Sequence, residues 1–578
     1  MLLLVLTALA WVVPQDETAA GDEVARAEAI ASDATRALKV VDAAFVRTGD
    51  PFGGSIGPDI VSADARAAEL PRASLEALQR PPDERIQVRS APAPPEELVL
   101  DETTGREDAL DDVERLYADL AAALGGRPTR AAEIKAKRVV PATDASAGTF
   151  DLRFRVRHVR EGEDETIAAK SYWNVRVEES GDVLRIVGWA GRIVDVARLE
   201  GDRSEGGFVD VARSVFGGDR ARWLAPSIME LRDTLDVDVG VGILGHHGVA
   251  VADVNGDGIE DVYLCQPGGI PNQLWLRRPD GSAVEVAASG GLDLVDATTS
   301  ALFVDLDGDD DRDVVLGLGG GVLILARTDA GYREAARIDR IGITGLAAAD
   351  VDGDRRIDVY ACAYANPYDG STFPVPYHDA ENGQANLFLS NVTEAADELR
   401  FVDATEAAGL DDAGGRFSFA ATFEDFDDDG DIDLYVANDF GRNALYVNDG
   451  SGVFANRAAE LGVEDVAAGM GAAFADVDGD CLADLYVSNM ESSAGRRVTG
   501  QEVFRRDVDE STRALLRRHA KGNTLYLGAG GGPFRETDEA SAGQWAWGSI
   551  PIDLDADGRL DLFVPNGFVT GTGKAPDL

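Results

Sequence analysis

The sequence predicts a mainly β protein in which a small α+β domain precedes a β-propeller. Two observations support this prediction. An acidic segment of nine residues recurs six times between residues 253 and 561, and each copy lies between apolar, strand-like segments. Before residue 200, the hydrophobic period is first that of a helix and then the period of two that is typical of strands. Short antiparallel sheets that repeat about an axis form a propeller.

Length and charge limit the possible functions. A chain of 578 residues is too long for one ordinary core, so we expect two or more domains. The formal net charge is −50 and the sequence pI is about 4.3. Such a surface repels phosphates and anionic lipids, which excludes nucleic acid as a main partner. Hydrophobic residues make up 45% of the chain, as in folded proteins, so we expect a globular protein. Its large negative charge suggests bound cations, a habitat of high salt concentration, or both.

The first residues indicate export. The stretch "MLLLVLTALAWVVPQ" is apolar from Leu2 to Val13, and we interpret residues 1–20 as a signal peptide whose cleavage site stays open. We therefore expect a secreted protein, extracellular or periplasmic. No later apolar run reaches membrane-spanning length, so membrane insertion is not expected.

Residues 21–200 predict helices followed by a small antiparallel sheet. Apolar residues recur at helical spacing over residues 22–47 and 110–124, and a proline-rich stretch that we interpret as a linker lies between them. From Phe150 the pattern alternates, and it places Arg153, Arg155 and Arg157 on one face. This arginine face either binds anions or pairs with carboxylates of the chain. The domain's role stays open, and residues 201–224 are either a linker or a first propeller strand.

The six acidic loops start at Asp253, Asp305, Asp350, Asp425, Asp476 and Asp553. Four carboxylate-type groups in one tight loop repel each other unless a cation lies among them. A hard divalent ion with six to eight oxygen ligands is Ca²⁺. Side chains at positions one, three, five and nine and the main-chain carbonyl at position seven would bind it. The candidate ligands in chain order are Asp253, Asn255, Asp257, Ile259, Asp261; Asp305, Asp307, Asp309, Asp311, Asp313; Asp350, Asp352, Asp354, Arg356, Asp358; Asp425, Asp427, Asp429, Asp431, Asp433; Asp476, Asp478, Asp480, Leu482, Asp484; and Asp553, Asp555, Asp557, Arg559, Asp561.

Glycine at position six allows the left-handed backbone that closes such a loop. Gly258, Gly430 and Gly558 meet this requirement in the first, fourth and sixth loops. Asp310, Arg355 and Cys481 occupy this position in the other three loops, which are therefore weaker candidates. An EF-hand is excluded, because it needs flanking helices and an acidic residue where the first loop has Leu264. Cys265 and Cys362 lie at the same place in two repeats, so we expect small buried residues without a disulfide bond.

A second signature follows most loops, in the segments "NQLWL" (272–276), "NLFLSN" (386–391), "NALYVND" (443–449) and "NTLYL" (523–527). Together with "FVDATEAAGL" (401–410) and "AWGSIPIDLDADGRLDLFVPNG" (546–567), these motifs make residues from about 225 to 578 resemble the FG-GAP/VCBS repeat family, which includes the integrin alpha head. The chain also resembles cartilage acidic protein and the ASPIC/UnbV proteins. The resemblance implies a seven-bladed propeller stabilised by Ca²⁺ on a secreted or surface protein.

The chain departs from this family in two ways. Six acidic loops are present, so six blades are the alternative to seven, and the usual ASPIC/UnbV segment does not precede Leu578. The last blade is then degenerate, closed by another strand, or truncated.

We expect a partner on two long insertions. Residues 364–384 carry Tyr364, Tyr368, Phe373 and Tyr377, and residues 489–522 include a basic segment, 504–521, expected to be helical. That segment either binds an anionic partner or pairs with the protein's own carboxylates.

No catalytic motif is present in the sequence. The leading hypothesis is a non-enzymatic adhesion or protein-interaction scaffold. A lectin that stacks sugars on the aromatic residues, and then a glycan-cleaving enzyme, are the alternatives; the oligomeric state stays open.

Overall fold

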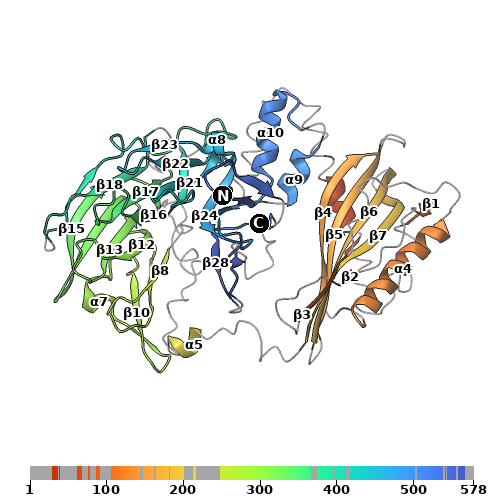
Figure 1. Ribbon diagram of the computed structural model, residues 1–578. Helices are drawn as coiled ribbons and strands as arrows, with labels where there is room; N and C mark the ends of the chain where they lie inside the picture. The colour runs from red at the N-terminus through yellow and green to blue at the C-terminus, as the bar shows by residue number, and fades with distance from the viewer. Residues whose placement is uncertain are drawn as a thin grey trace. The chain divides into compact units, whose positions relative to one another are not determined.

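The structure is a computed structural model (Figure 1). It describes residues 248–566 except 366–373, 396–397, 412–414, 492, 502–503, 538–539, 542, 544 and 555–557. Of the preceding chain it describes residues 26, 29–36, 38–39, 61–67, 76–77, 86–90, 106–200 except 127, 129, 143–147, 162–164 and 181–182, and 212–216. The expected signal peptide lies outside the described residues. Within them, no helix is both long and apolar enough to cross a membrane.

The chain divides into two compact units. The amino-terminal unit comprises residues 1–209, 492–517 and 569–578, and the repeat unit comprises residues 210–491 and 518–568. The insertion at 489–522 is therefore shared between the units.

The amino-terminal unit contains a helix on one face of a large sheet. The helix is α4 (Arg106–Ala123), and the sheet runs in the order β2-β3-β7-β6-β5-β4, with β1 parallel to β7. The strands are β1 (Val61–Ala67), β2 (Glu76–Ala77), β3 (Ile86–Ser90), β4 (Arg130–Pro141), β5 (Thr149–Glu161), β6 (Glu165–Ser180) and β7 (Val183–Glu200). The predicted helices and antiparallel strands are thus present, but β3 lies within the proline-rich stretch interpreted as a linker. It pairs with β7 because its residues alternate in the same period of two.

The core of this unit is aromatic. Trp173 of β6 is fully buried, with its ring 5.0 Å from Trp189 of β7 and 5.7 Å from Tyr117 of α4. On β5, Leu152, Phe154 and Val156 are buried, so the arginines that alternate with them point to the other face, as predicted. On that face, Arg176 donates to both carboxylate oxygens of Asp151, at 2.6 and 2.8 Å. Pairing with the chain's own carboxylates therefore occurs there.

The repeat unit is a series of antiparallel sheets (Figure 1). We number the repeats one to six in chain order. Repeat 1 contains β8 (Val249–Ala252), β9 (Asp261–Leu264), β10 (Gln273–Arg277) and β11 (Ala283–Glu285); repeat 2 contains β12 (Thr298–Val304), β13 (Asp313–Leu318), β14 (Gly321–Thr328) and β15 (Gly331–Asp339); repeat 3 contains β16 (Ile343–Ala349), β17 (Asp358–Ala363), β18 (Leu387–Asn391) and β19 (Phe401–Asp403).

The remaining repeats follow the same order. Repeat 4 contains β20 (Phe417–Glu424), β21 (Asp433–Gly441), β22 (Ala444–Asn448) and β23 (Phe454–Asn456); repeat 5 contains β24 (Ala467–Ala475), β25 (Asp484–Asn489), β26 (Thr524–Leu527) and β27 (Arg535–Thr537); repeat 6 contains β28 (Ile550–Ile552) and β29 (Asp561–Phe563). Each acidic loop joins the first strand of its repeat to the second. The mainly β architecture is confirmed, but a seventh sheet is not among the described residues.

Neighbouring repeats share their cores. The first strands lie side by side in the order β8, β12, β16, β20, β24, β28. Tyr435 and Ala437 of repeat 4 pack with Leu485 and Val487 of repeat 5 in one buried cluster. The three seams from repeat 1 to repeat 4 are built in the same way. In repeats 2, 3 and 4, one face of the sheet therefore packs on the following repeat and the other face on the preceding repeat, as in propeller blades.

Short helices complete the fold. They are α5 (Ala212–Val215), α7 (Ala287–Gly290), α8 (Ala458–Leu461), α9 (Ser493–Thr499) and α10 (Glu510–His519). The helix expected at 504–521 thus covers only its second half. Cys265 and Cys362 are buried and unbridged, as expected, and Cys481 is exposed.

Candidate metal sites

The acidic loops fold around the carboxylate at position one. In the second loop, Asp305 accepts hydrogen bonds from the main-chain N–H groups of Gly308, Asp309 and Asp310 at 2.7–3.2 Å. The loops that begin at Asp253, Asp350, Asp425, Asp476 and Asp553 repeat some or all of these bonds. The first carboxylate therefore sets the turn, as in an Asx-type turn.

The carboxylate at position nine anchors each loop to its sheet. Asp313 accepts the N–H of Leu306 at 3.0 Å and the N–H of Arg327, which lies on the third strand of the same repeat, at 2.8 Å. Asp261, Asp358, Asp433 and Asp484 occupy the same position and are buried. They receive the same third-strand bond. Asp561 of repeat 6 accepts the bond from position two, Leu554, at 3.1 Å.

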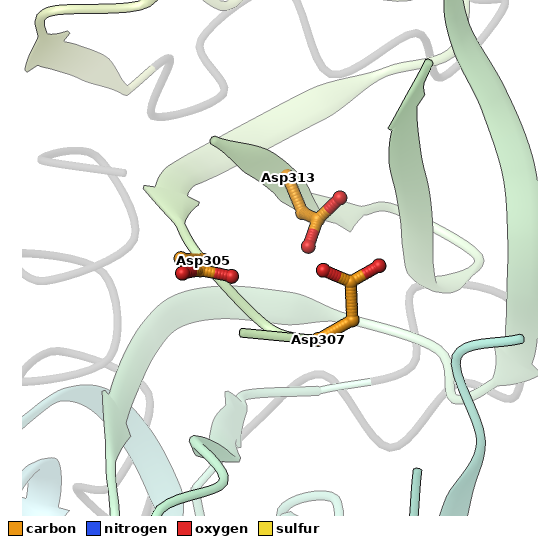
Figure 2. A group of neighbouring side chains, drawn as sticks. All are labelled: Asp305, Asp307 and Asp313. Atoms are coloured by element: carbon orange, nitrogen blue, oxygen red, sulfur yellow. The ribbon is translucent and has the colours of Figure 1, made fainter. Parts of the chain in front are cut away.

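Positions one, three and nine converge in four loops. Their carboxylate oxygens lie within 4.8 Å of one another in Asp305/Asp307/Asp313, Asp350/Asp352/Asp358, Asp425/Asp427/Asp433 and Asp476/Asp478/Asp484. Figure 2 shows the second loop, where the side chains of Asp307 and Asp313 point toward each other and Asp305 approaches the same space from another side. Oxygen donors at this spacing match a hard divalent cation.

Position five lies outside these groups. Asp309, Asp354, Asp429 and Asp480 each accept the N–H of the residue at position seven, at 2.9–3.0 Å. In the third loop the guanidinium of Arg356, at position seven, also pairs with Asp354. The carboxylate at position five thus accepts a main-chain N–H, and the carboxylates that converge are those at positions one, three and nine. The expected role of the main-chain carbonyl at position seven stays a prediction.

Several of the converging carboxylates are buried without compensation. Oδ1 of Asp307, Oδ1 of Asp427 and Oδ2 of Asp433 have no hydrogen-bond partner among the described residues. Burial, followed by repulsion from Asp313 and Asp309, raises the pKa of Asp307 to about 7. Burial likewise raises the pKa of Asp433 to about 7 and that of Asp358 to about 6. A divalent cation would satisfy the unpartnered oxygens and offset this repulsion, so these residues fit such an ion.

The first and sixth loops differ from the other four. In the first, Asn255 replaces the carboxylate at position three, and its amide donates to Asp257 at 3.1 Å. In the sixth, Asp555 and Asp557 lie outside the described residues, whereas Asp553 accepts the N–H of Gly558 at 2.9 Å. No group of three converging carboxylates is found in the described part of either loop.

The left-handed backbone at position six also forms in the three loops without glycine, whereas the expectation that these loops are weaker sites stays a prediction. Asp310, Arg355 and Cys481 adopt φ values of 71°, 68° and 69°, in the same region as Gly258 at 82°. The bonds to the first carboxylate hold the backbone there despite the Cβ atom. The sequence reasoning also missed position four, which is left-handed at Gly256, Gly308, Gly353 and Gly479, and at Asp428 with φ 59°. The recurring Asp-Gly pattern was the available signal.

Position two was also missed. Its apolar side chain inserts into the seam with the following repeat: Val254, Leu306, Val351 and Phe426 each belong to the buried cluster shared with that repeat. The next repeat also lies over position three. A Cβ on Gly452 of repeat 4 would lie 3.3 Å from Cβ of Asp352 in repeat 3. The acidic loops therefore lie at the seams between repeats.

The asparagine that begins the second signature is structural. Asn272, Asn386, Asn443 and Asn523 are buried and accept a main-chain N–H near the end of the preceding strand, at 2.7–2.8 Å. Three of them donate to a buried tyrosine of the second strand. They fix the connection between the second and third strands of each repeat and are not near the acidic groups.

Comparison with known proteins identifies the repeats. The model of the FG-GAP-like repeat matches residues 253–316 and 425–487, which include the first, second, fourth and fifth acidic loops. No curated protein sequence matches the chain.

Two of the solved structures that match illustrate the low level of similarity. The V. cholerae biofilm matrix protein Bap1 is 14% identical with a TM-score of 0.28, over 51% of this chain and 39% of Bap1, so the chain spans less than half the length of that protein. Sqt1 of Saccharomyces cerevisiae is 8% identical with a TM-score of 0.25, over 75% of this chain and 94% of Sqt1. Similarity at this level does not establish a shared fold, whereas the repeat match agrees with the position of the acidic loops in each sheet. The chain therefore contains FG-GAP-like repeats at these two places.

Proposed function

We propose that the repeats form a calcium-binding β-propeller that acts as an extracellular adhesion or protein-interaction scaffold. The observation that carries the proposal is the position of the acidic groups. Four of them gather three carboxylates within 4.8 Å, and in three of these loops the residue at position two inserts into the next repeat. A cation bound there stabilises the loop and the seam together.

The choice of Ca²⁺ rests on the ligand chemistry. All converging atoms are carboxylate oxygens, and the loops are exposed on their outer side at positions four and six. Ca²⁺ tolerates flexible oxygen coordination and retained water, whereas Mg²⁺ demands a near-ideal octahedron. The apolar segment from Leu2 to Val13 supports secretion as part of this proposal, and millimolar extracellular calcium suits weak sites of this kind.

The two ends of the repeat series support a further blade. Val249 and Val251 of repeat 1 are 62% and 60% exposed on the face that would meet a preceding blade, and Ile550 of repeat 6 is 52% exposed on the face that would meet a following one. Apolar faces of this type are covered at the inner seams. We therefore propose a closed ring of seven blades, in which a further blade lies between repeats 6 and 1.

The contacts of the insertions favour a scaffold over a lectin. Tyr364 donates to Asp439 at 2.7 Å, and Tyr377 packs on Phe440 with ring centroids 5.0 Å apart, so neither ring is free to stack on a sugar. The other two aromatic residues lie outside the described residues. In the second insertion, Arg518 binds Asp465 at 2.8 Å. Other basic side chains of this segment, Arg505, Arg513, Arg517 and Lys521, also form ion pairs with the chain's own carboxylates, as one of the two interpretations predicts.

Calcium binding is tested by thermal unfolding of the full chain in 10 mM CaCl₂, in 10 mM MgCl₂ and in chelator. With dissociation constants of about 10⁻⁴ to 10⁻³ M, each occupied site adds about 1.5–3 kcal/mol to the free energy of unfolding. We expect the transition of the repeats to rise with calcium and to respond less to magnesium. Identical transitions in calcium and chelator would refute the proposal. A pull-down with and without calcium then tests for a protein partner on residues 364–384 and 489–522.

One substitution assigns the effect to the loops. Asp427→Asn removes a buried carboxylate whose pKa is raised by burial and by Asp429. We expect this variant to be more stable than the parent by about 1 kcal/mol in chelator, because repulsion is relieved, and less stable in calcium, because a ligand is lost. Asp329→Asn removes the same charge from an exposed turn outside the loops and should show neither effect. A destabilisation of equal size in both buffers would show that Asp427 is not a ligand.

A further inference from the structure

Two asparagines connect successive acidic loops. Asn391 ends β18 in repeat 3, and Asn448 ends β22 in repeat 4; both side chains are buried. Each lies at the third-strand position whose main-chain N–H binds the carboxylate at position nine: Asn391 to Asp358 and Asn448 to Asp433, both at 2.8 Å. Each asparagine is thus tied to the acidic group of its own repeat.

The side-chain amide reaches the preceding repeat as well. Nδ2 of Asn391 donates to the carbonyl of Leu306 at 2.8 Å, and Nδ2 of Asn448 donates to the carbonyl of Val351 at 2.7 Å. Leu306 and Val351 occupy position two of the second and third loops. The same Nδ2 atoms donate to position eight of their own loops, Ile357 at 3.2 Å and Ile432 at 3.0 Å. One amide therefore bridges two loops in each case.

Position two lies within the acidic site itself. The N–H of Leu306 is held by the carboxylate of Asp313, at position nine of the second loop, and the N–H of Val351 is held by Asp358 in the third. The N–H of the buried residue at position two is thus bound by a carboxylate of the proposed metal site, and its carbonyl is bound by the asparagine of the next repeat. A cation that orders this carboxylate also orders the residue at position two, and through its carbonyl the asparagine side chain that donates to it from the next repeat.

We propose that Asn391 and Asn448 couple cation binding at the second, third and fourth loops, so that these three sites fill cooperatively. The coupling rests on the proposed function, since it concerns the ion these loops are proposed to bind. The first and fifth loops lack such a bridge. The residues that would link them to the second and fourth loops are Arg327 and Gly528, which bind position nine through their main-chain N–H. Neither has a side-chain amide, so these loops fill independently of the other three.

The experiment is a calcium titration of the full chain, read by competition with a chromophoric chelator and by isothermal calorimetry. The parent should bind with a Hill coefficient above 1. Asn448→Ala should lower the coefficient to about 1 and weaken the tighter phase about five-fold or more, since coupling between sites is commonly in this range. The number of ions bound should not change, because Asn448 is not itself a ligand.

Two further variants separate coupling from simple loss of stability. Asn448→Asp keeps the shape of the side chain and the oxygen that accepts the N–H of Gly450 and Gly452, but it removes the donor to Val351. It should also abolish cooperativity, and it serves where Asn448→Ala does not fold. Asn523→Ala is the matched control: Asn523 is equally buried, but it donates to Tyr486 within repeat 5. It should lower stability and leave the Hill coefficient unchanged.

The outcomes separate the two proposals. Calcium uptake with an unchanged Hill coefficient in both Asn448 variants, or with no cooperativity in the parent, overturns the coupling and leaves the proposed calcium binding intact. A parent that takes up no calcium overturns the proposed function, and the coupling with it. Loss of cooperativity in Asn523→Ala as well would show that it follows from general destabilisation and would also overturn the coupling.

Discussion

The two units of the chain stabilise their sheets by different means. In the amino-terminal unit one large sheet buries its apolar face under α4, around Trp173, Trp189 and Tyr117. In the repeat unit each repeat contributes four strands or fewer, and repeats 2, 3 and 4 bury both faces against their neighbours. The four groups of converging carboxylates found among the described residues also lie in the repeats.

This difference shows where charge is tolerated. A single sheet with its own core is complete without ions, so its charged residues can remain on the outer face. A repeat depends on its neighbours, and its loops place like charges where sheets join. The amino-terminal unit should therefore respond to changes in packing, and the repeat unit should respond to changes in charge and in cations as well.

The largest expected effect tests whether the amino-terminal unit depends on its own packed core. Trp173→Ala removes a fully buried ring and should destabilise the amino-terminal unit by about 3–5 kcal/mol. Calorimetry should show its transition falling by about 10 °C, while the transition of the repeats and its response to calcium stay unchanged. Trp275→Ala in repeat 1, where the ring is 6% exposed, is the matched control and should move the other transition. Equal shifts in both transitions would mean that the units unfold as one.

A second prediction concerns a buried carboxylate outside the loops. Asp439 is 2% exposed; its Oδ2 accepts the hydroxyl of Tyr364, and its Oδ1 has no partner in the described part of the chain. Burial raises its pKa to about 7. A carboxyl group whose pKa is higher in the folded state contributes stability that is complete below about pH 4 and is lost as the pH rises to about 7.

Asp439→Asn remains neutral at every pH and should remove this loss. At pH 8 the variant should exceed the parent by roughly 3 kcal/mol in urea unfolding, and the difference should vanish near pH 4, with or without calcium. The control is Asp465→Asn, because Asp465 is equally buried but binds Arg518 at 2.8 Å. That variant should be destabilised at pH 8. A pH profile for Asp439→Asn parallel to the parent's would contradict the prediction.

Much of this architecture could be predicted from the sequence. The period of two around Phe154, and the six copies of the acidic motif between apolar segments, indicated the sheets and their loops because both patterns are local. The grouping of positions one, three and nine could not be read in the same way. Position five carries an aspartate, as position one does, but in the structure its carboxylate accepts the main-chain N–H of position seven, as Asp309 does from Asp311.

The contacts between neighbouring repeats also could not be predicted from the sequence. Leu306 reads as an ordinary apolar residue inside an acidic motif, and its place in the core of the next repeat depends on contacts far along the chain. Asn391 reads as the end of a strand, although its amide spans 85 residues to reach Leu306. Local patterns specify a repeat, whereas the relation between repeats depends on packing that no single motif encodes.

The smallest expected effect compares one loop with another. Cys481 holds a left-handed backbone with φ 69° at position six, where the first loop has Gly258. A side chain at this conformation costs about 1 kcal/mol, and part of the gain from glycine is offset by the greater freedom of the unfolded chain. Cys481→Gly should therefore stabilise the repeats by about 0.5 kcal/mol in urea unfolding, with or without calcium, because the backbone has the same conformation in both states. Gly258→Ala should change stability in the opposite direction. If Cys481→Gly instead destabilises the repeats only in calcium, the side chain at position six contributes to the metal site. The first and fifth loops would then differ in metal binding as well as in backbone strain.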